Sequence, residues 1–179
     1  MMSRTSAWIL LLAVLAAAFG GWLQHRARLA HGERTAPGDM APALALPDLD
    51  GRTHRLADFA GRRVLINLWA SWCAPCLEEM PALNRAWLRH RAHAQVLGIA
   101  MDEPSRVRSL LAAHPVDYPI LIGRLESPDT ASLLGDSDGV LPYSVLLDEH
   151  GRVLARRRGR LDEATLEHWL TPATPPTAP

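Results

Sequence analysis

The hydrophobic pattern of residues 64–101 predicts a strand, a helix and a second strand. Residues 64–69 are apolar at nearly every position, which is typical of a central strand covered on both faces. Apolar residues then recur at helical intervals as far as Trp87, and they predict a helix that ends near His90. The apolar run 95–101 predicts the next strand. Two strands joined through a helix indicate a parallel β-α-β unit.

The rest of the chain extends this alternation. A second helix is expected to begin at residues 102–104, with Pro104 near its first turn, and to stop before Pro115. The later elements expected from the pattern are a short strand at 118–122, a short helix at 129–134, a hairpin of 141–147 with 153–158, and a last helix at 162–170. Alternating strands and helices favour a parallel central sheet with right-handed crossovers. The pattern therefore indicates one α/β domain.

An Asp-Gly turn separates two short strand-like stretches before the first central strand. Residues 43–46 and 53–56 flank Asp50 and Gly51, and this dipeptide is a strong signal for a β-hairpin. A helical turn at 56–59 is expected next. The sequence therefore predicts an added N-terminal hairpin.

The two ends of the chain differ from its middle in composition. Residues 1–23 contain a long uncharged apolar run, which predicts a membrane anchor, with a cleaved signal peptide as the alternative. Residues 24–36 are polar and are interpreted as a tether, and residues 171–179 predict a disordered tail. The α/β domain then spans residues 37–170, and a hydrophobic content of 48% is ample for one core.

The only two cysteines, Cys73 and Cys76, lie where the first central strand gives way to its helix. Their spacing lets both sulfurs meet across one turn, so a disulfide can open and close with little backbone movement. The free N–H groups of a helix start stabilise a thiolate, and thiols in such motifs have a pKa of about 3.5–7.5 instead of about 8.5. We expect Cys73 to attack substrates and the less accessible Cys76 to resolve the mixed disulfide. Pro75, with a fixed φ and no N–H, stiffens the turn.

A structural disulfide or half of a metal site is the other interpretation of this motif. A staple inside one helical turn constrains little chain entropy. A zinc site needs further Cys or His ligands, and the eight histidines show no suitable pair, with His90 and His93 expected on different faces of their helix. The strand-then-helix context favours a redox dithiol, with no metal and no cofactor beyond the cysteine pair.

The stretch that resembles a known family is NLWASWCAPC, residues 67–76, followed by Glu79 and Pro81. It is similar to the TlpA/ResA family of membrane-tethered extracytoplasmic thioredoxins, a part of the thioredoxin superfamily related to AhpC/TSA and Redoxin proteins. The resemblance covers about residues 37–170. It implies thiol:disulfide exchange on a thioredoxin-like α/β fold, with a central mixed β-sheet flanked by helices, an extra N-terminal β-hairpin and a short central insertion.

The resemblance also implies a substrate groove beside the dithiol. In thioredoxin-like proteins the proline that opens the matching strand is cis and packs beside the cysteines, a role implied here for Pro142, and an ordinary edge-strand proline is the alternative. Leu141 would then offer its backbone to an extended substrate. The groove residues expected on this basis are Trp72, Pro75, Leu141 and Tyr143.

Glu79 lies three residues after Cys76, on the same side of the helix. Partial burial raises the pKa of a carboxyl group toward the range useful for proton transfer. The family uses a glutamate at this position in that way, so we expect Glu79 to act on the proton of the buried thiol; a solvated charge is the alternative. Asn67 stands where cytoplasmic thioredoxins have a buried aspartate, and an asparagine cannot shuttle protons.

The resemblance further implies a domain that faces the periplasm from the cell inner membrane, or is secreted there if the signal is cleaved. The implied substrates are protein disulfides, and the implied electron donor is a membrane thiol reductase. The favoured direction is reduction, in cytochrome c maturation or copper-site assembly. One alternative on the same fold is a Cu(I) carrier that binds the ion with the two thiolates and Met80. Another is a thiol peroxidase, although the usual motif of that class is missing here. A formal net charge of zero gives no reason to propose nucleic acid as a partner.

Overall fold

A computed structural model of the protein describes residues 19–21 and 36–171. By its internal contacts the chain divides into two compact units, Met1–Glu33 and Arg34–Pro179, and the α/β domain belongs to the second. Of the expected anchor only residues 19–21 are described, and they are helical. Of the expected tether only Ala36 is described, and of the expected tail only Thr171. The other residues of these three segments lie outside the described part of the chain. Within the described residues, no helix has the length and apolar character needed to cross a membrane.

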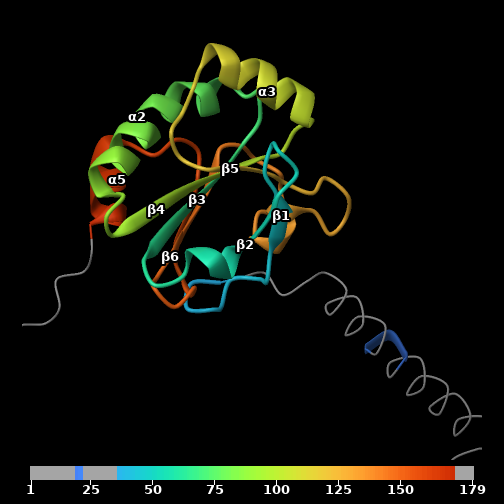
Figure 1. The fold of residues 1–179 in the computed structure, drawn as a ribbon. Helices are drawn as coiled ribbons and strands as arrows, with labels where there is room; N and C mark the ends of the chain where they lie inside the picture. The colour runs from blue at the N-terminus through green and yellow to red at the C-terminus, as the bar shows by residue number, and fades with distance from the viewer. Residues whose placement is uncertain (1–18, 22–35, 172–179) are drawn as a thin grey trace, which may run out of the picture. The chain divides into compact units, whose positions relative to one another are not determined.

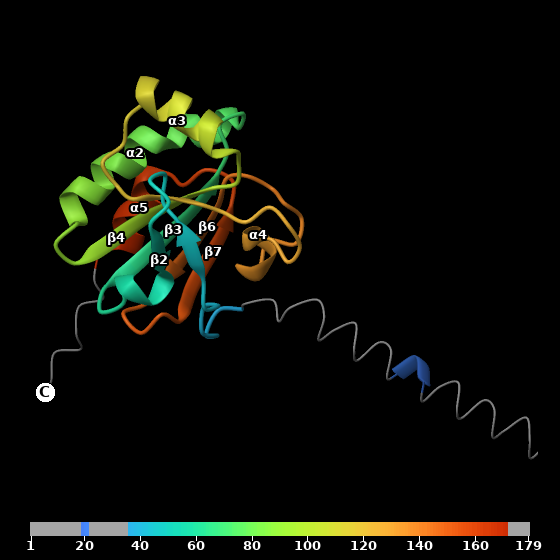
Figure 2. The ribbon, with the colours of Figure 1, turned by 45° about the vertical axis from the view of Figure 1, so that its right-hand side comes forward.

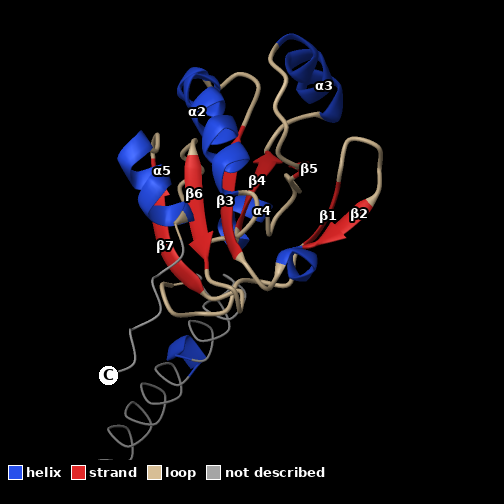
Figure 3. Cartoon of the chain, turned by 60° about the vertical axis from the view of Figure 1, so that its left-hand side comes forward, coloured by secondary structure: helices blue, strands red, loops and turns tan. Residues whose placement is uncertain are grey.

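Five strands form the central sheet of the domain (Figure 1), and Figure 3 shows their order, β5-β4-β3-β6-β7. The first three run parallel, whereas β6 is antiparallel to β3 and β7 is antiparallel to β6. The sheet is therefore mixed, which confirms the expected fold class. The strand bounds are Arg63–Trp69 for β3, Ala94–Ala100 for β4, Ile120–Ile122 for β5, Tyr143–Leu147 for β6 and Val153–Arg158 for β7.

Two helices cover one face of this sheet. Helix α2 (Ala74–His90) and helix α5 (Glu163–Leu170) lie side by side over the central strands (Figure 3). Their apolar sides meet the sheet in one buried cluster, in which Leu83 and Leu166 pack with Leu65 of β3. Helix α2 ends at the residue predicted from the apolar spacing.

Helix α3 (Pro104–Ala113) follows β4 and begins with its proline, as expected. Its buried Val107 packs with Ala100 at the end of β4 and with Trp69 at the end of β3. The same cluster contains both cysteines. The carboxyl ends of the two central parallel strands are therefore the place where α3 meets the start of α2.

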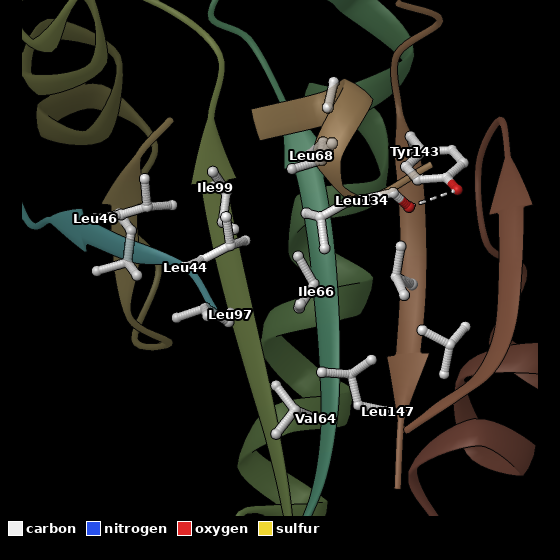
Figure 4. Packing of buried hydrophobic residues seen from close by; sticks show 14 residues of the cluster. Leu44, Leu46, Val64, Ile66, Leu68, Leu97, Ile99, Leu134, Tyr143 and Leu147 are labelled. Atoms are coloured by element: carbon white, nitrogen blue, oxygen red, sulfur yellow. Dashed lines mark hydrogen bonds between the residues drawn. The ribbon is translucent and has the colours of Figure 1, made fainter. Parts of the chain in front are cut away.

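The opposite face of the sheet is covered by short elements. They are the hairpin strands β1 (Ala45–Pro47) and β2 (Thr53–Arg55), the 3₁₀ turn η1 (Leu56–Phe59) and the short helix α4 (Thr130–Leu133), whose positions appear in Figure 2. Leu44 and Leu46 from the hairpin side lie against Leu97 and Ile99 of β4 (Figure 4). The expected hairpin and the short insertion are both present, and together they close an apolar core on this face.

Candidate active site

The cysteines lie at the junction of β3 and α2. Cys73 is the N-cap of α2, and its Sγ accepts a hydrogen bond from the backbone N–H of Cys76 at 3.3 Å. The two residues form a disulfide with an S–S distance of 2.08 Å. Pro75 lies in the first turn of the helix, where no N–H is needed. The sulfur of Cys73 thus lies at the positive end of the helix dipole, where a thiolate is stabilised.

The two sulfurs differ in their access to solvent. Cys76 is completely buried, whereas Cys73 retains 5% of its accessible surface. Beside it the side chain of Trp72 is 66% exposed, and Pro75 is exposed as well. Cys73 is therefore the sulfur that a substrate can reach, at a rim formed by exposed apolar side chains.

The loop before β6 lies beside the disulfide. The Leu141–Pro142 peptide bond is cis, which agrees with the resemblance, and Pro142 is buried. The half-buried Leu141 packs against the cluster that contains Cys73 and Cys76. Within the described part of the chain, the backbone of Leu141 has no hydrogen-bond partner. This backbone is free to pair with an extended segment.

The expected groove position of Tyr143 was wrong. Its side chain is buried in the apolar core on the face away from α2, and its hydroxyl donates to the Leu134 carbonyl at 3.2 Å (Figure 4). Successive side chains of a strand point to opposite faces. The residue directly after Pro142 therefore points into the core, and Ser144 points toward α2.

Glu79 lies in the second turn of α2 and is buried, with 3% of its surface exposed. One carboxylate oxygen accepts from Asn67 Nδ2 at 2.8 Å, and the other accepts from the backbone N–H of Leu161 at 2.9 Å. Burial raises the pKa of the Glu79 carboxyl group, and these hydrogen bonds, together with the charge of Arg160, oppose the rise only in part. A carboxyl group with a raised pKa on the same side of α2 as Cys76 is suited to exchange a proton with that thiol.

The neighbouring Glu78 has a different environment. It is exposed and forms an ion pair with Arg160. Because consecutive helical residues point about 100° apart, one glutamate reaches solvent and the other reaches the sheet. The two neighbouring acids therefore lie in different environments.

Asp102 is a site residue that the sequence interpretation missed. Its buried carboxylate accepts from the backbone N–H of Ser71 at 3.1 Å and also from the Ser71 hydroxyl, and it accepts from the N–H of Glu103 at 2.8 Å. Burial alone would raise the pKa of Asp102, but these hydrogen bonds outweigh it and the pKa is lowered. The ionised Asp102 therefore holds the loop two residues before Cys73. Its position two residues after β4 was the available signal, since parallel strands end at one edge of the sheet.

The expected separation of His90 and His93 was also wrong. The helix ends at His90, and the turn that follows brings His93 Nε2 to 3.1 Å from His90 Nδ1. Across the described ranges, no group of three or more His, Cys, Asp or Glu side chains is arranged to hold a metal ion.

A model of the AhpC/TSA family matches residues 37–169. The chain belongs to the AhpC/TSA family. Among related proteins, the thiol-disulfide oxidoreductase ResA of Geobacillus thermodenitrificans is 30% identical over 174 residues, which cover 96% of this chain and 95% of that protein. ResA of Geobacillus kaustophilus is 31% identical over 142 residues, with 78% and 79% covered. This AhpC/TSA protein is accordingly a TlpA/ResA-like member of the thioredoxin superfamily, as its dithiol stretch predicted.

Solved structures agree with this assignment. A putative thiol:disulfide interchange protein DsbE from Chlorobium tepidum superposes with a TM-score of 0.65 at 30% identity, covering 74% of this chain and 92% of that one. The thioredoxin domain of a thiol-disulfide oxidoreductase from Bacteroides vulgatus gives 0.64 at 25% identity, covering 76% and 99%. These relatives and the Cys73–Cys76 disulfide together support thiol–disulfide oxidoreductase activity for this AhpC/TSA protein.

Proposed function

We propose that the protein is a membrane-anchored, extracytoplasmic reductase of protein disulfides. The observation that carries the proposal is the disulfide at the start of α2, in which accessible Cys73 caps the helix and buried Cys76 lies on the side of Glu79. A low thiol pKa is needed at the attacking sulfur and a proton acceptor is needed at the resolving one. The helix start is a position at which a thiolate is stabilised, and the Glu79 carboxylate is the proposed proton acceptor for Cys76.

In the proposed reaction the Cys73 thiolate attacks one sulfur of a substrate disulfide. A mixed disulfide forms, and the second substrate sulfur leaves as a thiolate. Cys76 then gives its proton to the Glu79 carboxylate and attacks Cys73 Sγ, which releases the first substrate sulfur. The substrate gains two electrons, and the protein ends with the Cys73–Cys76 disulfide.

The substrate would dock in the groove between Trp72, Pro75 and Leu141. The unpaired backbone of Leu141 can add an extended substrate segment as a short strand, and the exposed indole of Trp72 offers apolar contact area. Candidate substrates are apocytochrome c or the cysteines of a copper site, on the basis of the family resemblance.

Repeated turnover requires reduction of the Cys73–Cys76 disulfide. In an oxidising compartment these electrons have to cross the membrane, so a membrane thiol reductase is the proposed donor. Residues 1–23 would hold the domain at the periplasmic side of the inner membrane, with residues 24–36 as a tether.

A trapping experiment tests the exchange reaction. The Cys76→Ser variant, reduced and mixed with insulin, is expected to accumulate a mixed disulfide through Cys73, because its resolving thiol is missing. The matched control, Cys73→Ser, is expected to form none, because Cys76 is buried. Equal trapping by both variants, or none by either, would contradict the proposed roles.

A redox equilibrium tests the direction of the reaction. The wild-type protein is equilibrated with glutathione buffers, and the fraction of reduced dithiol is measured by alkylation. A reductase is expected to have a potential near the roughly −270 mV of thioredoxin, whereas a value near about −120 mV would identify an oxidant and contradict the proposed direction.

A further inference from the structure

The two ends of the Asn67 side-chain amide differ in their hydrogen bonding. Asn67 is completely buried in the centre of β3, and its Nδ2 donates to Glu79 Oε1 at 2.8 Å and to Ser144 Oγ at 3.1 Å. Its carbonyl oxygen Oδ1 is buried and has no hydrogen-bond partner among the described residues. Buried amide oxygens are ordinarily paired, since an unpaired one costs about 1–3 kcal/mol.

The partners of Glu79 differ in what they can do once the acid gains a proton. The backbone N–H of Leu161 can only donate, so the oxygen that faces it has to remain an acceptor. Asn67 can donate or accept, depending on which end of its amide faces Glu79. The hydroxyl of Ser144, the register partner of Asn67 on β6, can also do either.

We propose that the Asn67 amide turns by half a revolution about its terminal side-chain bond when Glu79 is protonated. Oδ1 then accepts from the Glu79 hydroxyl and from the Ser144 hydroxyl, while Nδ2 takes the place that Oδ1 leaves. The two ends of an amide have nearly the same shape, so the packing around β3 is unchanged, and the unpaired position passes from Oδ1 to Nδ2. Asn67 and Ser144 are in this way positioning residues that support both protonation states of Glu79.

This inference rests on the proposed role of Glu79 as the acceptor of the Cys76 proton. The proton moves from Cys76 Sγ to the Glu79 carboxylate, and no electron moves in this step. Without the turn of the amide, a protonated Glu79 would face an N–H donor at each oxygen. With it, the acid receives an acceptor at the moment of protonation.

The other polar groups that face Glu79 do not take part in the change. Arg160, from the loop before α5, is engaged with the exposed Glu78 of α2. Tyr118, from the segment before β5, has a buried hydroxyl whose pKa is raised by burial and by the charge of Glu79, so it stays protonated. Asn67 and Ser144 are the neutral groups that can reverse their hydrogen bonds.

Nuclear magnetic resonance of the reduced full-length chain tests this directly. The Glu79 carboxyl carbon and the Asn67 side-chain amide are followed as the pH is lowered. The amide protons of Asn67 are expected to move upfield with the same midpoint as the Glu79 carbon, because they lose two acceptors. The amide of Gln95, buried on β4 and donating to the Val96 carbonyl, is the matched control and stays constant.

A Glu79→Gln variant gives an independent readout. The glutamine accepts from Leu161 and presents an NH₂ group to Asn67, so it imitates the protonated acid. Its Asn67 amide signals at neutral pH are expected to match those of the wild-type protein below the Glu79 midpoint. In Asn67→Ala the Glu79 midpoint is expected to rise, because the charge-assisted donor lost by the ionised acid is stronger than the neutral acceptor lost by the protonated acid.

Unchanged Asn67 signals through the Glu79 titration, or signals in Glu79→Gln equal to those of the ionised wild type, would overturn the inference. Insulin reduction by the same samples separates the two proposals. Exchange without the amide change overturns only this inference, whereas the amide change without exchange supports it and overturns the proposed function.

Discussion

The two faces of the sheet differ most where β3 meets β6. On one face Ile66 and Leu68 lie in a continuous apolar cluster (Figure 4). On the other face Asn67 and Ser144, paired across the two strands, meet the carboxyl group of Glu79. Alternating side chains thus give this pair of strands a wholly apolar face and a face on which buried polar groups are hydrogen-bonded to one another. A buried charge is tolerated on the second face because both of its oxygens are hydrogen-bonded.

The largest expected effect is a loss of stability in Ile66→Ala, which changes only the apolar face. Ile66 is completely buried, and truncating such a side chain leaves a cavity that costs about 4 kcal/mol. Urea denaturation of the oxidised protein measures this loss. The rate at which Cys73 attacks a small disulfide, measured where the variant is folded, is expected to stay within about twofold, because Ile66 lies on the face away from α2.

Leu88→Ala is the control for this loss, since Leu88 is a 43% exposed leucine of α2 and its truncation is expected to cost less than about 0.5 kcal/mol. A tenfold fall in the attack rate of folded Ile66→Ala would show that the two faces are not separate in function.

A smaller effect on the free energy of unfolding, visible in its pH dependence, is expected from Glu79→Gln. Burial raises the pKa of Glu79 above its ordinary value of 4.5, so the folded state holds this proton at a pH where the unfolded state has lost it. Stability contributed by the protonated acid is therefore present below pH 4.5 and is lost as the pH rises through the raised pKa. The Glu79→Gln variant does not lose stability in this way. Its free energy of unfolding relative to wild type is therefore expected to increase as the pH rises from 4.5 through the raised pKa of Glu79.

Denaturation curves at several pH values between about 4 and 8 measure this difference. Glu78→Gln, a change of the same kind at the exposed neighbour, is the control and is expected to follow the wild-type pH dependence. Parallel curves for wild type and Glu79→Gln would mean that Glu79 does not pay a burial cost when ionised.

The apolar pattern was sufficient for most of the fold. The run at 64–69 and the helical spacing that follows placed β3 and α2, and Asp50 with Gly51 placed the hairpin. These signals are local, because they depend on period and on turn chemistry. The cysteine spacing likewise placed the dithiol at the helix start without knowledge of any distant contact.

The errors arose where a side chain's direction or partner depends on distant segments. Tyr143 was assigned to the groove because it follows Pro142, but the strand parity fixed by β3 turns it into the core. The Leu161 N–H that holds Glu79 lies 82 residues further along the chain, and a backbone donor leaves no mark in the sequence. Ser144 became a site residue only through its pairing with Asn67.

The neighbouring acids Glu78 and Glu79 carry a consequence for changes in chain length. Their different surroundings depend only on how many residues separate each from Cys76, since every added residue rotates the helix by about 100°. Inserting a single alanine after Cys76 would bring the preceding acid into the buried position and aim the original one elsewhere, without altering any side chain at the site. The spacing between Cys76 and Glu79 therefore does not tolerate an inserted residue. The exposed turn at Asp50 and Gly51 would tolerate one.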